Sequence, residues 1–301
     1  MRSLFSFLAL AAFAVVGSLA PDARGDSTIN TTNSYAWGAN IGWTNWLPSS
    51  ANGVVVGEYV CSGYIWSANA GWIHLGNGTP VNNIQYQNDS TADYGVNYSF
   101  DPSQPGVAVL RGLAYGANIG WISFEAQGNP RVSLFTGTFT GYAYSANCGW
   151  INLNDINGKV QTDHVVMGTD ADSDEIADAF EYQNWGNLTT ADMSSDADYD
   201  GISDKDEYLD GTSPLISTDR LQITSFGTNS DGTSSPITWT SNTARLYVIE
   251  TKTDLLALMW DLDPTYGTPF APDAGTSTTR TISAASATKR FYRVRSIRPL
   301  P

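Results

Sequence analysis

The sequence predicts a mainly β protein, with a duplicated all-β hairpin-repeat domain, a small acidic loop-helix module and a C-terminal β-sandwich. Three observations support this class: a β-type pattern that occurs four times, a concentration of acidic residues after it, and short alternating strands near the end. We expect an N-terminal segment at 1–25 and domains at 26–158, 159–215 and 216–301.

The N-terminal segment has the features of a secretory signal peptide. Arg2 is followed by an uncharged apolar stretch up to Ala20, and small residues near Gly25 suit cleavage. The alternative is an uncleaved membrane anchor, although the stretch is at the lower limit for a span. We therefore expect a secreted or cell-surface protein with no stable membrane span after cleavage. The sequence leaves open whether Cys61 and Cys148 form a disulfide or are separate buried thiols.

The first half contains an internal duplication. A ten-residue pattern such as G-Y-A-Y-S-A-N-C-G-W ends at Trp43, Trp72, Trp121 and Trp150. The first and third copies are 78 residues apart, as are the second and fourth, so each unit holds two patterns. Alternating residues around an Asn-x-Gly turn predict β-hairpins, and hence a barrel, a sandwich or a short stack.

The aromatic residues of the repeats have two interpretations. We expect the four repeated tryptophans to be core residues, because each repeat needs something large to bury. The alternative is a row of exposed rings that stack on sugars, for which Trp37, Trp46 and Trp66 are the better candidates because they vary between copies. The repeated asparagines are expected to serve turns: Asn40, Asn69, Asn118 and Asn147.

The acidic module contains the strongest chemical signal. Residues 196–207 fit the twelve-residue calcium loop D-x-D-x-D-G-x-x-D-x-x-E at every specified position. Carboxylates two residues apart can surround one cation, and the final glutamate can close the shell with both oxygens. The predicted ligands are Asp196, Asp198, Asp200, the carbonyl of Ile202, Asp204 and Glu207.

A second copy of this loop lies 26 residues upstream. Its predicted ligands are Asp170, Asp172, Asp174, Ile176, Asp178 and Glu181. This copy has Glu175 where the other has Gly201, so the sharp turn is expected to be strained or altered. We expect a short helix after each loop, at 178–185 and 204–209. The alternative is a solvated acidic linker, which has no reason to repeat the spacing.

Residues 169–214 resemble the EF-hand-like thrombospondin type 3 and dockerin-like calcium repeats of secreted bacterial proteins. The resemblance is carried by the loops, by W-G-N-L at 185–188 and by E-Y-L-D-G-T-S-P at 207–214. It implies a calcium-rigidified spacer or a docking module. The preceding repeats resemble G-Y-A-W-x-x-N-x-G-W-I segments of uncharacterised exported bacterial proteins. This second resemblance implies no activity.

The last segment alternates like short strands, which predicts a small β-sandwich. Its pattern resembles fibronectin type III-like domains, through Trp239, Y-V-I-E at 247–250 and R-F-Y-R-V at 290–294.

Composition excludes several function classes. The chain has 15 Lys and Arg against 30 Asp and Glu, so it lacks the basic surface that nucleic acids require. With His74 and His164 alone, a multi-histidine metal site is excluded, and no motif pairs either with a nucleophile. We expect a non-enzymatic, exported calcium-binding protein in adhesion, scaffolding or assembly, with an unidentified protein or glycan partner at the cell surface. The alternative is a carbohydrate-binding module or an accessory protein of extracellular polysaccharide degradation.

Overall fold

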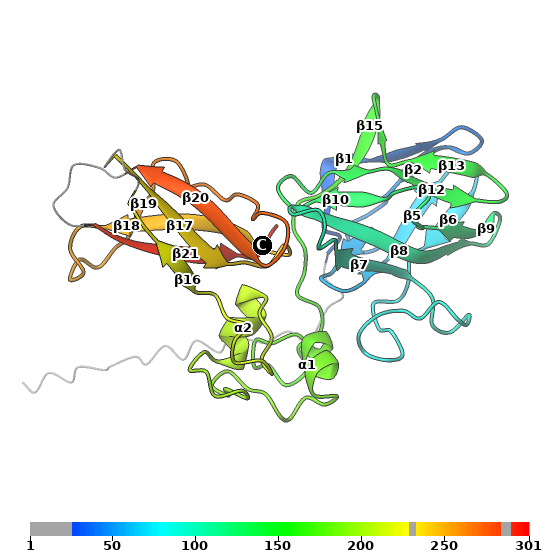
Figure 1. The fold of residues 1–301 in the computed structure, drawn as a ribbon. Helices are drawn as coiled ribbons and strands as arrows, with labels where there is room; N and C mark the ends of the chain where they lie inside the picture. Colours follow the sequence, from blue (N-terminus) through cyan, green and yellow to red (C-terminus); the bar gives the residue numbers. More distant parts are fainter. Residues whose placement is uncertain (1–25, 229–232, 284–289, 301) are drawn as a thin grey trace, which may run out of the picture.

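The computed structural model describes residues 26–228, 233–283 and 290–300 (Figure 1). The predicted signal peptide at 1–25 lies outside these residues. The prediction of a mainly β fold is confirmed, since the described part contains twenty-one strands and two seven-residue helices, α1 (Asp178–Asn184) and α2 (Asp204–Asp210). Neither helix is long or apolar enough to cross a membrane.

Eight strands form a closed antiparallel barrel from four hairpins, one for each copy of the repeated pattern. The first hairpin also closes the barrel, because Trp37 pairs with Asn152 of the fourth. In order, the hairpins are β1 (Ile29–Gly38) with β2 (Gly42–Asn45), β5 (Tyr64–Ser67) with β6 (Gly71–His74), β8 (Val107–Gly116) with β9 (Gly120–Ser123), and β12 (Tyr142–Ser145) with β13 (Gly149–Asn152).

The repeated asparagines do more than form turns. Each side-chain amide donates a hydrogen bond to a backbone carbonyl of a neighbouring hairpin, which links the four tips in a ring. The bonds are Asn40 to Cys148 (3.1 Å), Asn69 to Ile41 (3.1 Å), Asn118 to Ala70 (3.2 Å) and Asn147 to Ile119 (3.0 Å).

The repeated tryptophans lie on the outside of the barrel, so the expectation that they form its core is wrong. Their exposed fractions are 38% for Trp43, 48% for Trp72, 40% for Trp121 and 47% for Trp150. The next residue along each strand is buried, because neighbouring residues of a strand face opposite sides; it is Thr44 in the first hairpin and an isoleucine in the other three. An eight-stranded barrel is narrow, and its interior is filled by small aliphatic side chains such as Ala36 and Ile151.

Further strands extend the sheet of the barrel: β7 (Val96–Phe100), β10 (Arg131–Ser133), β11 (Phe139–Thr140), β14 (Asn154–Asp155) and β15 (Gly158–Thr162). Strands β3 (Val55–Val56) and β4 (Cys61–Ser62) form a separate two-stranded sheet. Trp46 is buried against Phe124 and Phe139, which removes it from the surface candidates. Cys61 and Cys148 are both buried free thiols.

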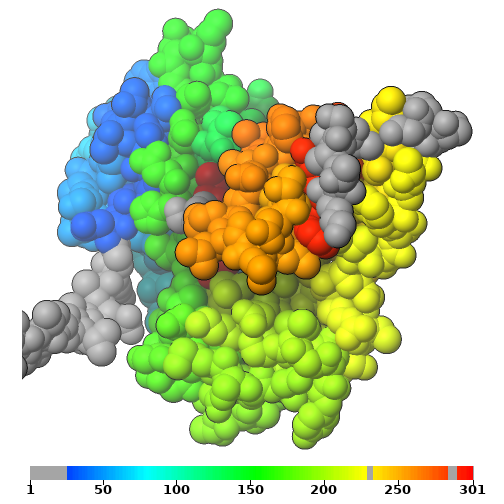
Figure 2. Space-filling model, turned by 90° about the vertical axis from the view of Figure 1, so that its left-hand side faces the viewer, coloured from blue at the N-terminus to red at the C-terminus, as the bar shows by residue number. Residues whose placement is uncertain are grey.

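The C-terminal residues form two three-stranded sheets. One contains β16 (Ile223–Phe226), β17 (Ser234–Thr240) and β20 (Ser277–Ser283), and the other β18 (Leu246–Lys252), β19 (Asp261–Leu262) and β21 (Phe291–Ile297). Trp239 of the first sheet and Tyr247 of the second meet in the shared core. The acidic module lies below these sheets and the barrel (Figure 2).

Candidate metal centre

The first acidic loop brings its predicted carboxylates together. Ligand atoms of Asp170, Asp172 and Asp178 lie within 4.8 Å of one another, and so do those of Asp172, Asp174 and Glu181. Each set could hold a metal ion, and Asp172 belongs to both. All five predicted carboxylate ligands of this loop are therefore in one place.

The second loop gathers three aspartates in the same way. Ligand atoms of Asp196, Asp198 and Asp200 lie within 4.8 Å of one another. Glu207 is fully buried beside them, and only its Oε1 is bonded, by the Thr212 hydroxyl at 3.3 Å. Asp204 is not part of this set, and its oxygens accept hydrogen bonds from the Ala197 amide and the Ser195 hydroxyl.

The closing glutamates of both loops have buried carboxylate oxygens without a hydrogen-bond partner in the part of the chain that the structure describes. Glu181 is fully buried, and neither of its oxygens has a hydrogen-bond partner among the described residues; the same is true of Glu207 Oε2. Desolvation, with nearby carboxylates, raises the pKa of Glu181 and of Glu207 to about 8. A buried carboxylate without a partner is costly. A cation in each loop would remove that cost.

The loop backbones are folded by their own side chains. Asp170 accepts hydrogen bonds from the amides of Asp174 and Glu175, at 3.2 and 3.1 Å. Asp196 accepts from the equivalent amides of Asp200 and Gly201, at 3.2 and 3.0 Å. The two loops therefore have the same turn.

The predicted isoleucine ligands sit just after that turn. The Ile176 and Ile202 amides donate to Asp174 and Asp200, at 2.9 and 2.8 Å. The Ile176 side chain is fully buried in the module core, whereas Ile202 is half-buried. The two isoleucines thus occupy matching backbone positions but anchor their loops to different depths.

Glu175 adopts the same left-handed turn conformation as Gly201. Its φ is 69°, in the left-handed region, against 92° for Gly201. Left-handed backbone is unfavourable for a side chain with a Cβ atom, so the first loop carries strain. Its carboxylate extends across to the second loop, where Lys205 Nζ lies 2.5 Å away.

A polar junction next to the second loop was missed by sequence reasoning. Tyr208 follows the predicted ligand Glu207 and donates a hydrogen bond at 2.6 Å to Glu58, which lies between β3 and β4 of the repeat domain. Arg298, after β21, pairs with the same Glu58 carboxylate. Arg245 donates to the carbonyls of Tyr208 and Leu209, at 2.6 and 2.7 Å. The tyrosine lies in the E-Y motif, but no local pattern marks its partners.

The module has a small apolar core of its own, against which one residue of the repeat domain packs. Ile176, Ala177, Ala191 and Tyr208 are buried together, and Tyr59 of the repeat domain packs against them. Helix α1 adds Phe180, whose ring centroid lies 5.1 Å from that of Tyr208. The two helices that follow the loops are therefore joined to each other and to the repeat domain.

The fold and this site define a mainly β chain with two carboxylate-lined loops that could each hold a metal ion. No family model matches the chain, and neither a curated protein nor a solved structure matches it.

Proposed function

We propose that this chain is an exported, non-catalytic calcium-binding protein of the cell surface or its surroundings, acting in adhesion, scaffolding or assembly. In this proposal a thrombospondin type 3- or dockerin-like module joins the repeat domain to a fibronectin type III-like β-sandwich. The observation that carries it is the pair of buried closing glutamates with unpartnered oxygens, each beside a cluster of aspartates.

The donor set favours calcium over other metals. Every side-chain ligand in the two loops is a carboxylate oxygen, which suits hard cations such as Ca²⁺ and Mg²⁺. Calcium accepts six to eight oxygens in flexible geometry, whereas Mg²⁺ demands a near-octahedral shell. The twelve-residue spacing with a glutamate at its end is typical of calcium loops.

Calcium binding at the second loop would affect the polar junction formed by Tyr208, Glu58, Arg245 and Arg298. Glu207, Tyr208 and the carbonyl of Leu209 all belong to helix α2, so a cation held by Glu207 fixes the residues that contact Glu58, Arg245 and Arg298. Those partners come from the repeat domain and from the C-terminal sheets. Calcium would therefore hold both in one arrangement, as expected of a stiff connector.

Calorimetric titration of the chain from Asp26 with CaCl₂, and small-angle scattering in calcium and in chelator, test this proposal. We expect two sites with dissociation constants of about 10⁻⁴–10⁻³ M, typical of extracellular modules, and a larger radius of gyration in chelator. Tyr208→Phe should keep both sites while loosening the junction. Absence of binding at millimolar calcium would overturn the proposal.

A second candidate function, carbohydrate binding, is favoured by the exposed rings. Each hairpin carries an aromatic pair on its outer face: Trp37–Trp43, Trp66–Trp72, Tyr115–Trp121 and Tyr144–Trp150, with centroids 4.8, 4.8, 4.9 and 4.8 Å apart. Trp37 and Trp66, two of the rings expected to contact sugars, are exposed. A glycan screen tests this candidate, and an absence of hits would remove it.

A further inference from the structure

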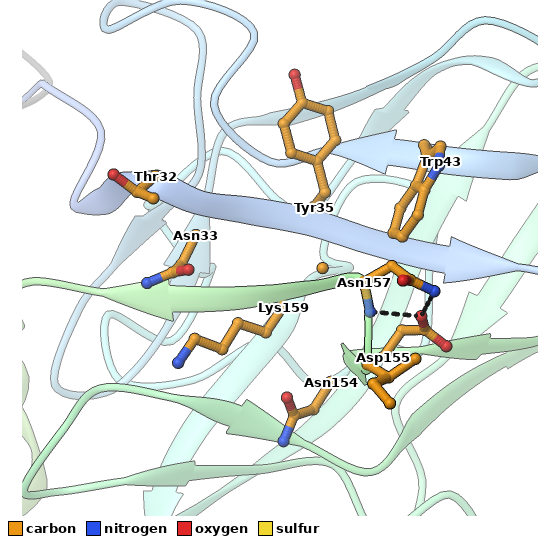
Figure 3. A pocket seen from close by; sticks show the side chains of 10 residues that line it. Thr32, Asn33, Tyr35, Trp43, Asn154, Asp155, Asn157 and Lys159 are labelled. Atoms are coloured by element: carbon orange, nitrogen blue, oxygen red, sulfur yellow. Dashed lines mark hydrogen bonds between the residues drawn. The ribbon is translucent and has the colours of Figure 1, made fainter.

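A hollow of about 860 Å³ lies beside the first hairpin, where the β14–β15 hairpin stands next to it (Figure 3). This size is within the range of roughly 300–1,000 Å³ that is usual for small-ligand sites. The rings of Tyr35 and Trp43 line one side. The polar side chains of the hollow belong to Thr32, Asn33, Asn154, Asp155, Asn157 and Lys159.

We propose that this hollow binds pyranose units of a neutral polysaccharide, with Trp43 as the stacking platform. This inference rests on the second candidate function and gives it a location and a ligand class. It does not depend on the calcium loops.

Trp43 is both exposed and held in place. Its ring lies 4.8 Å from Trp37 and 6.4 Å from Tyr35 between centroids, with both partners edge-on. A Cβ atom at Gly158 would lie only 2.8 Å from Trp43 Cζ3, so the backbone of the β14–β15 hairpin packs directly against the ring. A ring fixed before binding loses little conformational entropy when a sugar stacks on it.

The polar side chains supply what sugar hydroxyls need. Asn33 donates to Gln161 at 2.7 Å, which fixes the orientation of its amide. Asp155 accepts from the Asn157 backbone and side chain, at 3.0 and 3.3 Å, and is held in the same way. Figure 3 shows Asn154, Asp155 and Lys159 on the other side of the hollow from the two rings. Hydroxyls donate and accept, and this wall offers partners for both.

The charge balance favours a neutral ligand. The hollow contains one carboxylate, Asp155, and one ammonium, Lys159, which offset each other. The chain as a whole has a net charge of −15, so a polyanionic glycan would be repelled as it approached. Neutral polysaccharides experience no such repulsion.

The second hairpin provides a matched control. Tyr64 and Trp72 repeat the geometry of Tyr35 and Trp43, with centroids 6.1 Å apart and edge-on rings. Trp72 is more exposed than Trp43, at 48% against 38%, but it is not among the residues that line the hollow. If exposed rings alone bound sugars, Trp72 would contribute at least as much as Trp43.

The experiment is a tryptophan-fluorescence and affinity-electrophoresis titration of the chain from Asp26 with soluble β-glucan, xylan and galactomannan, and with alginate as the anionic probe. We expect saturable binding to a neutral polysaccharide, about tenfold weaker for Trp43→Ala, several-fold weaker for Asn154→Ala and Lys159→Ala, and unchanged for Trp72→Ala. Asn154 is exposed and Lys159 half-buried, so these two variants report on the site even if Trp43→Ala impairs folding.

The outcomes separate the site from the function. Binding that Trp43→Ala and Asn154→Ala leave intact would overturn this site while carbohydrate binding stands. Equal losses in Trp43→Ala and Trp72→Ala would show general adhesion to rings, and a preference for alginate would overturn the neutral ligand. If no polysaccharide bound, the site and the second candidate function would both fall, with the calcium proposal unaffected.

Discussion

The two acidic loops share their spacing but differ in how they use it. Asp178 of loop 170–181 and Asp204 of loop 196–207 each accept a hydrogen bond from a loop amide, of Ala171 and Ala197 respectively. Asp178 also lies in a cluster with Asp170 and Asp172, whereas Asp204 accepts a second bond from the Ser195 hydroxyl. The first loop has a strained turn residue and the second a glycine. Spacing therefore fixes which carboxylates converge, while the turn residue and the flanking side chains set how well each loop suits a cation.

Removal of calcium should have the largest effect, because it empties both loops. At a calcium concentration 100 times the dissociation constant, each site adds about 2.7 kcal/mol of stability. Chelation should therefore increase hydrogen exchange strongly in α1 and α2 and little in the barrel, whose hydrophobic core is separate. Mass spectrometry of exchanged peptides measures this, and equal protection with and without chelator would contradict it.

Replacing one closing glutamate should disable one loop. We expect Glu207→Gln and Glu181→Gln each to weaken their own site at least about tenfold, which is about 1.4 kcal/mol, because the amide cannot replace the buried carboxylate. Calorimetry should then count one remaining strong site. Asp206→Asn is the control, since it removes the same charge from an exposed residue of the second loop. If this control weakened binding equally, net charge rather than ligation would explain the result.

Much of the site could be predicted from local spacing, because the carboxylates of each loop lie within a twelve-residue segment. The junction could not, since Glu58 and Arg298 are 240 residues apart and neither belongs to a motif. The burial of Glu181 could not be predicted from spacing either, because it depends on how the module folds around the loop.

The hairpins could also be predicted from local sequence patterns, but their closure into a barrel could not. Alternation shows that Trp150 and Ile151 face opposite sides, but it does not show which side is inside. That choice depends on the pairing of β1 with β13, from opposite ends of the repeat domain, which leaves an interior suited to small aliphatic residues.

The turn residue should have a smaller effect, with opposite signs in the two loops. Glu175→Gly should relieve the left-handed strain and stabilise the calcium-loaded module by up to about 1 kcal/mol, whereas Gly201→Glu should destabilise it by at least that amount. Glu175→Asn separates conformation from charge, because asparagine tolerates this backbone without the carboxylate. Thermal melting in calcium tests the signs, and a loss of stability in Glu175→Gly would show that the carboxylate matters more than the strain.

The contact between the loops should have the smallest effect. Lys205 joins the second loop to Glu175 of the first, but the glutamate side chain is 65% exposed, and exposed ion pairs contribute only about 0.2–1 kcal/mol. A double-mutant cycle with Lys205→Ala and Glu175→Gln should give a coupling energy in that range, falling in high salt. The effect of Lys205→Ala on calcium affinity is a second readout, because Lys205 carries a positive charge within the second acidic loop. If Lys205→Ala strengthens calcium binding, the lysine ammonium competes with the cation. The ion pair with Glu175 would then hold that ammonium away from the carboxylates of the second loop.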